Sequence, residues 1–242
     1  RRYVREPQPL HFPSELPSFP VQEKVPESDG NFQRRVLLYA LVRHEFGENA
    51  LVGSDMFVYW DPSDTTRCLA PDLAVRVGTP AESLKTWKTW VHGAPHVGVE
   101  IVSDSDESEA AFRAKLGRYR QAGIGEVVRF DAHAETPLRF WDFFDGDLVE
   151  RQLAEPDAFR CDALGLYWCV REEPRIGRVL RLARDAAGSE LLPTPSEAEA
   201  ARAANEAARA ANEAARASNE AARAEAALAR VAELEAELAK RR

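Results

Sequence analysis

Cysteine, long apolar runs and excess positive charge are all scarce in this chain of 242 residues, and each shortage excludes a class of protein. The cysteines, Cys68, Cys161 and Cys169, are odd in number and form no C-x-x-C pair, which argues against a disulfide framework or a cysteine zinc site. No run approaches the roughly 18 apolar residues of a membrane span, and no signal peptide is visible. We therefore expect a cytoplasmic protein with reduced thiols and no membrane partner.

The formal net charge is −8, and most of it lies before Ser196. Tight non-specific binding to nucleic acid depends on neutralising phosphates with lysine and arginine, so this balance argues against it. Any nucleic-acid site must then be local, built from a few basic groups or from a bound metal ion. Hydrophobic residues make up 45% of the chain, which is enough for a substantial core.

Composition divides the chain into three parts. Residues 1–30 hold six of the fifteen prolines, which predicts an extended or irregular N-terminal arm because proline fixes φ and lacks an amide donor. Residues 31–195 have the mixed pattern of a folded domain. Residues 196–242 are rich in alanine and form the third part.

Periodicity within residues 31–195 predicts an α/β domain. Apolar residues recur every three or four positions in Asn31–Phe46, where Phe32, Val36 and Tyr39 mark the predicted buried face, widened by Leu37, Leu38, Leu41 and Val42. Glu107–Ala122 is the second predicted helix, with Phe112, Leu116 and Tyr119 facing a sheet. The predicted strands are Leu51–Trp60, Leu73–Val77, Val97–Ser103, Glu126–Asp131, the hairpin Leu138–Phe144 and Asp147–Leu153, and a strand pair or extended segment in Phe159–Val170.

The C-terminal part repeats the unit A-A-R-A-A-N-E. Its arginines, asparagines and glutamates each recur every seven residues, so they form one polar stripe on a helix and alanine fills the rest of the circumference. Val231, Leu234 and Leu238 then follow the three-then-four spacing of a seam. Such a helix needs a partner helix, and we predict a coiled coil that makes the protein a homodimer.

Three charged residues stand at the margins of the predicted elements. Asp72 follows a proline at the start of an apolar run, Glu100 lies within V-G-V-E-I-V, and Lys115 lies on the predicted helix 107–122. Side chains alternate along a strand, so each carboxylate projects from the less apolar face of its strand. If the two strands are neighbours, the two carboxylates meet within reach of the lysine.

Two adjacent carboxylates repel each other unless one is protonated or a cation lies between them. A hard ion such as Mg²⁺ takes oxygen ligands of this kind, polarises a phosphoryl oxygen and lowers the pKa of a coordinated water. Asp72 and Glu100 are therefore candidate metal ligands. Lys115 is a candidate for orienting the water or stabilising developing negative charge.

Three segments resemble one known family. P-D-L-A-V-R-V (Pro71–Val77), V-E-I-V-S (Val99–Ser103) and K-L-G-R-Y-R-Q-A-G-I-G-E (Lys115–Glu126) are similar to motifs of the Uma-type, restriction-endonuclease-like proteins of the PD-(D/E)XK nuclease superfamily. The resemblance covers roughly Asn31 to Val170. It implies a restriction-endonuclease-like mixed sheet flanked by helices.

The resemblance also implies function. It makes Asp72 and Glu100 the ligands of Mg²⁺ or Mn²⁺ and Lys115 the catalytic lysine of an endonuclease acting on phosphodiester bonds, with DNA as the expected nucleic acid. The superfamily often adds an acid from the first helix, for which Glu45 and Glu48 are the candidates here.

A second hypothesis comes from a different class of protein. Glu100 is costly to bury unpaired, and a salt bridge to Arg76 or Lys115 would satisfy it without any catalysis. The chain would then be a nuclease-fold interaction or oligomerisation protein whose site no longer turns over. Its acidic charge balance and long alanine-rich tail favour this alternative.

Overall fold

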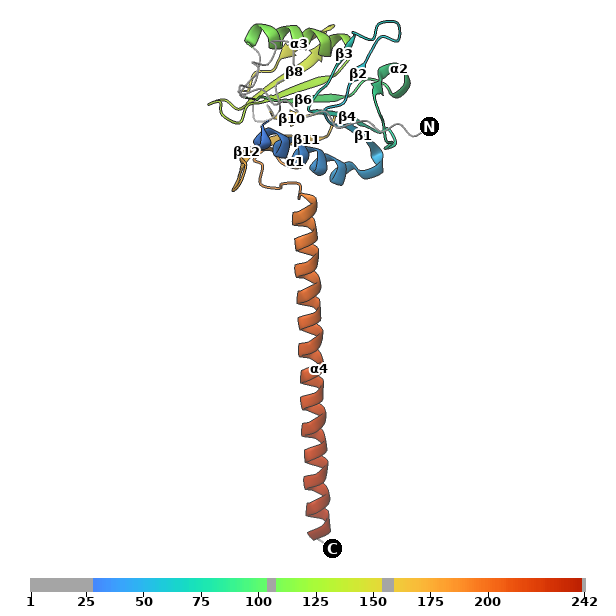
Figure 1. The fold of residues 1–242 in the computed structure, drawn as a ribbon. Helices are drawn as coiled ribbons and strands as arrows, with labels where there is room; N and C mark the ends of the chain where they lie inside the picture. Colours follow the sequence, from blue (N-terminus) through green and yellow to red (C-terminus); the bar gives the residue numbers. More distant parts are fainter. Residues whose placement is uncertain (1–27, 104–107, 154–158, 241–242) are drawn as a thin grey trace, which may run out of the picture.

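The computed structural model describes residues 28–103, 108–153 and 159–240. They form a mixed α/β domain from whose base one long helix projects (Figure 1). Most of the predicted N-terminal arm lies outside the described residues.

A six-stranded sheet organises the domain, in the order β1-β4-β6-β7-β8-β9. Only β6 and β7 run parallel, as expected for strands joined through the crossover helix α3; the other neighbours are antiparallel. Its strands are β1 (Ala50–Gly53), β4 (Leu73–Val77), β6 (Val97–Ile101), β7 (Glu126–Phe130), β8 (Leu138–Phe144) and β9 (Asp147–Glu150).

Two small sheets complete the domain. One has the order β10-β11-β12 and the other β3-β2-β5. Their strands are β10 (Arg160–Cys161), β11 (Leu166–Glu173), β12 (Gly177–Ala183), β2 (Val58–Tyr59), β3 (Cys68–Leu69) and β5 (Trp87–Lys88). The strand predicted for Leu51–Trp60 is thus two separate strands, and β12 has no predicted counterpart.

Two helices cover opposite faces of the large sheet (Figure 1). α1 (Asp29–Phe46) packs on one face, where Leu41, Val75 and Val99 belong to the main core. α3 (Glu109–Gln121) packs on the other face, where Tyr119 and Val127 belong to a second core. The short helix η1 (Gly47–Asn49) joins α1 to β1, and the short helix α2 (Thr89–His92) lies between β5 and β6.

Only part of the predicted apolar face of α1 is buried. Phe32, Val36 and Tyr39 are 49%, 46% and 36% exposed, whereas Leu38 and Leu41 are buried. Apolar residues lie on more than one side of this helix, so periodicity alone does not decide which side packs. The sheet selects the branched aliphatic side, which can interdigitate closely with the valines of β4 and β6.

α4 (Pro195–Lys240) is one uninterrupted helix of 46 residues. All of its residues are exposed except Ala198 near its base, which is partly covered. It begins with a capping box: the Glu197 amide donates to Thr194 Oγ1 at 3.2 Å, and the Thr194 amide donates to Glu197 Oε2 at 2.7 Å. Arg181 of β12 also donates to Glu197 Oε2, at 2.8 Å. These contacts fix the base of the helix to the domain.

Candidate active site

The strand register brings Asp72 and Glu100 together. β4 and β6 are antiparallel, with Leu73 opposite Val99 and Ala74 opposite Gly98. One step further along this register, Asp72 lies opposite Glu100, and directly opposed side chains project from the same face about 5 Å apart at Cβ. The Ile101 amide donates to Asp72 Oδ2 at 2.6 Å, which fixes the aspartate against the end of β6.

Two side chains of α3, one turn apart, donate hydrogen bonds to Glu100. Lys115 Nζ donates to Glu100 Oε2 at 2.6 Å, and the Tyr119 hydroxyl donates to Glu100 Oε1. Residues four apart on a helix share a face, so both reach the same carboxylate. Glu100 is only 8% exposed, and these donors offset a desolvation cost of several kcal/mol for a buried carboxylate.

Tyr119 reaches Glu100 because residue 98 is glycine. A Cβ at position 98 would lie 2.4 Å from Tyr119 Cε1, far inside van der Waals contact. The φ angle of Gly98 is not positive. This position therefore requires glycine for its small size and not for its backbone freedom. The tyrosine ring thereby packs against Gly98 of β6 and is fully buried.

The environment keeps Tyr119 a donor. Burial raises the pKa of its hydroxyl well above the usual value, and the nearby carboxylates of Glu100 and Asp72 raise it further. The hydroxyl therefore stays protonated through the neutral range. From the sequence alone, Tyr119 is expected only to face a sheet; its spacing of four from Lys115 is the signal that could have assigned it to the site.

The structure also places the other candidates. Glu45 forms an ion pair with Arg184 at 2.7 Å near the C-terminal end of α1, whereas the start of this helix approaches the site through Asn31, which donates to the Val102 carbonyl at 3.0 Å. Glu45 is therefore committed to a structural contact at the far end of the helix. Arg76, the other salt-bridge partner considered for Glu100, donates to the Ala94 carbonyl at 2.6 Å.

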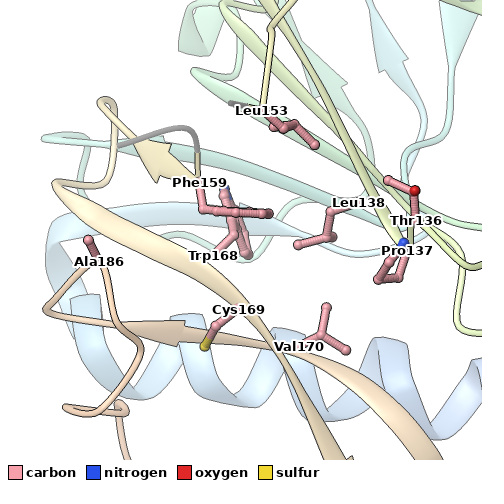
Figure 2. A pocket seen from close by; sticks show the side chains of 9 residues that line it. All are labelled: Thr136, Pro137, Leu138, Leu153, Phe159, Trp168, Cys169, Val170 and Ala186. Atoms are coloured by element: carbon pink, nitrogen blue, oxygen red, sulfur yellow. The ribbon is translucent and has the colours of Figure 1, made fainter. Parts of the chain in front are cut away.

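A separate apolar cavity of about 310 Å³ lies between β8 and β11. Figure 2 shows Leu138, Leu153, Phe159, Trp168 and Val170 around it. Neither Asp72, Glu100 nor Lys115 lines it, so this hollow and the charged site are different places in the fold.

The residues described contain no cluster of three or more histidine, cysteine or acidic side chains placed to hold a metal ion. The site offers two carboxylates from adjacent strands. Mg²⁺ is commonly held by one or two carboxylates together with water and substrate phosphates, so this donor set fits that ion. No helix among the described residues has the length and apolarity to cross a bilayer.

The family to which the chain is matched agrees with the sequence motifs. The sequence profile of the Uma2 family, whose description is "Putative restriction endonuclease", matches residues 21–164, more than half of the chain. A solved structure with a similar chain path is "a putative nuclease belonging to DUF820" from Anabaena variabilis ATCC 29413, with 15% identity and a TM-score of 0.44 over 61% of this chain and 80% of that one. The search of curated proteins returned no match.

Proposed function

The chain belongs to the Uma2 family, and from this premise we propose that it is a divalent-metal-dependent endonuclease that hydrolyses phosphodiester bonds in nucleic acid, with DNA as the substrate. The observation that carries the proposal is the convergence of Asp72 and Glu100 on one face of the sheet, with Lys115 bound to Glu100. Two opposed acids, one of them buried, repel each other, and a divalent cation between them would relieve that repulsion.

We assign Asp72 and Glu100 as the ligands of Mg²⁺ or Mn²⁺. Each carboxylate has one oxygen held by a scaffold donor: Oδ2 of Asp72 by the Ile101 amide and Oε1 of Glu100 by Tyr119. These contacts hold both carboxylates in position for a shared ion, with Lys115 donating to Oε2 of Glu100 at 2.6 Å. When bound, a divalent cation supplies polarisation of a phosphoryl oxygen and a lowered pKa of coordinated water.

Lys115 supplies positive charge at the same place. Its side chain is 22% exposed and its ammonium lies 2.6 Å from Glu100, so it is both held in position and accessible to a substrate phosphate. An ammonium fixed beforehand beside the reacting phosphate stabilises the charge that develops in the transition state. This is the role that we assign to it.

A plasmid-cleavage assay tests the proposed function. Purified protein is incubated with supercoiled DNA in Mg²⁺, in Mn²⁺ and in EDTA, beside Asp72→Ala and Glu100→Ala. We expect nicked and linear products with the wild-type protein in metal alone. Cleavage that survives in Asp72→Ala would rule out this site assignment.

α4 favours a second, compatible function in assembly. Leu228, Val231, Leu234 and Leu238 are 70%, 52%, 44% and 63% exposed, and their spacing places them on one side of the helix. We propose that this seam pairs with the same seam of a second copy as a coiled coil. If the protein cleaves no nucleic acid but sediments as a dimer that Leu234→Glu dissociates, the assembly function stands alone.

A further inference from the structure

A row of four charged residues crosses the α3-covered face of the large sheet. The register places Asp72 opposite Glu100, pairs Glu100 with Arg129 of β7, and pairs Arg129 with Arg139 of β8. Residues paired across neighbouring strands project from the same face. From β4 to β8 the row therefore reads acid, acid, base, base.

α3 lies along this row, and two of its residues carry charges opposite to those of the row residues that they contact. Lys115 binds Glu100 at 2.6 Å. Glu109, at the start of the helix, accepts hydrogen bonds from Arg139 at 2.9 and 3.0 Å. These contacts, two turns apart on the same helix, neutralise the second and fourth positions of the row.

The third position has a different partner. Facing Arg129, α3 presents the ring of Phe112, and the guanidinium carbon lies 4.8 Å from the ring centroid. A cation over an aromatic face is held and oriented, but its charge is not cancelled. No carboxylate of the described residues forms an ion pair with Arg129, whereas Arg139 in the same row binds both Glu109 and Glu150.

We propose that Arg129 binds a phosphate of the nucleic-acid strand next to the paired carboxylates; this inference rests on the proposed function. A planar guanidinium suits a phosphate better than any other side chain, because its donors match two phosphate oxygens at once. Arg129 is half-buried and paired in register with Glu100, so a phosphate bound to it neighbours the reaction centre. In a chain of net charge −8, such a local cation is what nucleic-acid binding requires.

Salt-dependent DNA binding tests this assignment. Fluorescence anisotropy with a labelled DNA duplex, in EDTA to prevent cleavage, gives the slope of log K against log salt concentration for wild-type protein, Arg129→Met, Arg129→Lys and Arg139→Met. Each phosphate contact contributes about 0.9 to the magnitude of this slope. We expect Arg129→Met to lower it by about 1, Arg129→Lys to restore most of it, and Arg139→Met to leave it unchanged.

The controls separate the possible failures. Methionine keeps an unbranched stem against Phe112, and thermal melting of each variant verifies the fold; if Arg129→Met does not fold, Arg129→Gln replaces it. An unchanged slope in the Arg129 variants, or an equal drop in Arg139→Met, overturns the inference and leaves the proposed function standing. A wild-type protein that binds DNA with no salt dependence overturns the inference and contradicts the nucleic-acid function as well.

Discussion

One cluster of charge lies on the large sheet at Glu100, and another lies at the base of α4 at Arg181. Each combines a cation with two carboxylates. In the Arg181 cluster the cation is buried, with a side chain 3% exposed, and its acidic partners Glu173 and Glu197 are 31% and 51% exposed. In the Glu100 cluster the acid is buried, with a side chain 10% exposed, and it pairs with Lys115.

The difference lies in which member of each cluster is buried. At Arg181 the carboxylates face water, which solvates them, so the cluster is stable as it stands and joins α4 to β12. At Glu100 the carboxylate itself is buried, beside Asp72, and water screens its charge less. Burial of the acid, more than the presence of an ion pair, therefore distinguishes the candidate site from a structural joint.

The largest expected effect concerns the lysine of the first cluster. We expect Lys115→Met to slow metal-dependent DNA cleavage by about 100- to 1,000-fold, since removing one preorganised donor from a reaction centre has an effect of that order. Single-turnover cleavage kinetics measure it. Lys88→Met, at an exposed lysine on β5, should cleave at the wild-type rate; an equal loss there would contradict a specific role for Lys115.

Substitution in the Arg181 cluster should lower the stability of the fold. Arg181→Met removes a buried guanidinium and leaves the Leu192 carbonyl without its donor at 2.9 Å, so we expect the free energy of unfolding to fall by about 3 kcal/mol. Urea denaturation measures this value. Arg230→Met, in an ion pair of α4 with both partners about two-thirds exposed, should change it by less than about 0.5 kcal/mol. Similar values for both variants would contradict a structural role for Arg181.

The packing of α3 over β6 can be tested with one type of substitution at two places. Gly98→Ala drives a methyl group into the Tyr119 ring, and we expect a loss of about 1–3 kcal/mol in stability. Gly117→Ala, on α3 itself, meets nothing within 4 Å and should stabilise the helix by about 0.5–1 kcal/mol. Thermal melting of the two variants should show opposite signs; a Gly98→Ala variant at least as stable as wild type would show that the ring does not need the glycine.

The smallest expected effect depends on pH and concerns Glu126, another partly buried acid of the sheet. Burial raises the pKa of Glu126 above its usual value, so the folded state takes up a proton before the unfolded state as the pH falls. This acid therefore contributes stability at low pH that is lost as the pH rises through its folded pKa. Glu126→Gln should unfold at a higher temperature than wild type at pH 7.

The higher unfolding temperature of Glu126→Gln should vanish below about pH 4, where Glu126 of the wild-type protein is protonated in both the folded and the unfolded state. Glutamine keeps an acceptor for the Ala163 amide, which donates to Glu126 Oε1 at 2.8 Å. The exposed Glu235→Gln in α4 is the control, and it should show no such pH-dependent difference. A Glu126→Gln variant less stable than wild type at every pH would contradict the role assigned to burial.

Local sequence signals predicted the elements that carry the site. β4 and β8 begin and end where their patterns predict, and the Asp145–Gly146 turn has the positive φ angles, 48° and 83°, that this residue pair tolerates. Because alternation decides which face a strand residue occupies, the convergence of Asp72 and Glu100 also followed from sequence once their strands were neighbours.

The features that the sequence did not predict depend on tertiary contacts. β12 is buried on both faces at its C-terminal half and includes the charged Arg181, so it shows neither alternation nor a continuous apolar run. The contribution of Arg129 depends on register across two strands and on the ring of Phe112, and a single sequence specifies neither. The pairing of Tyr119 with Glu100 likewise required the close approach at Gly98.

The most direct test of a shared cation is isothermal titration of Mn²⁺ into the wild-type protein and into Asp72→Asn. The asparagine oxygen can still accept from the Ile101 amide, so the fold should persist with an unchanged or higher melting temperature. Our account predicts one site in the wild-type protein and an affinity at least about tenfold weaker in the variant. Equal Mn²⁺ affinity in the two proteins would contradict it.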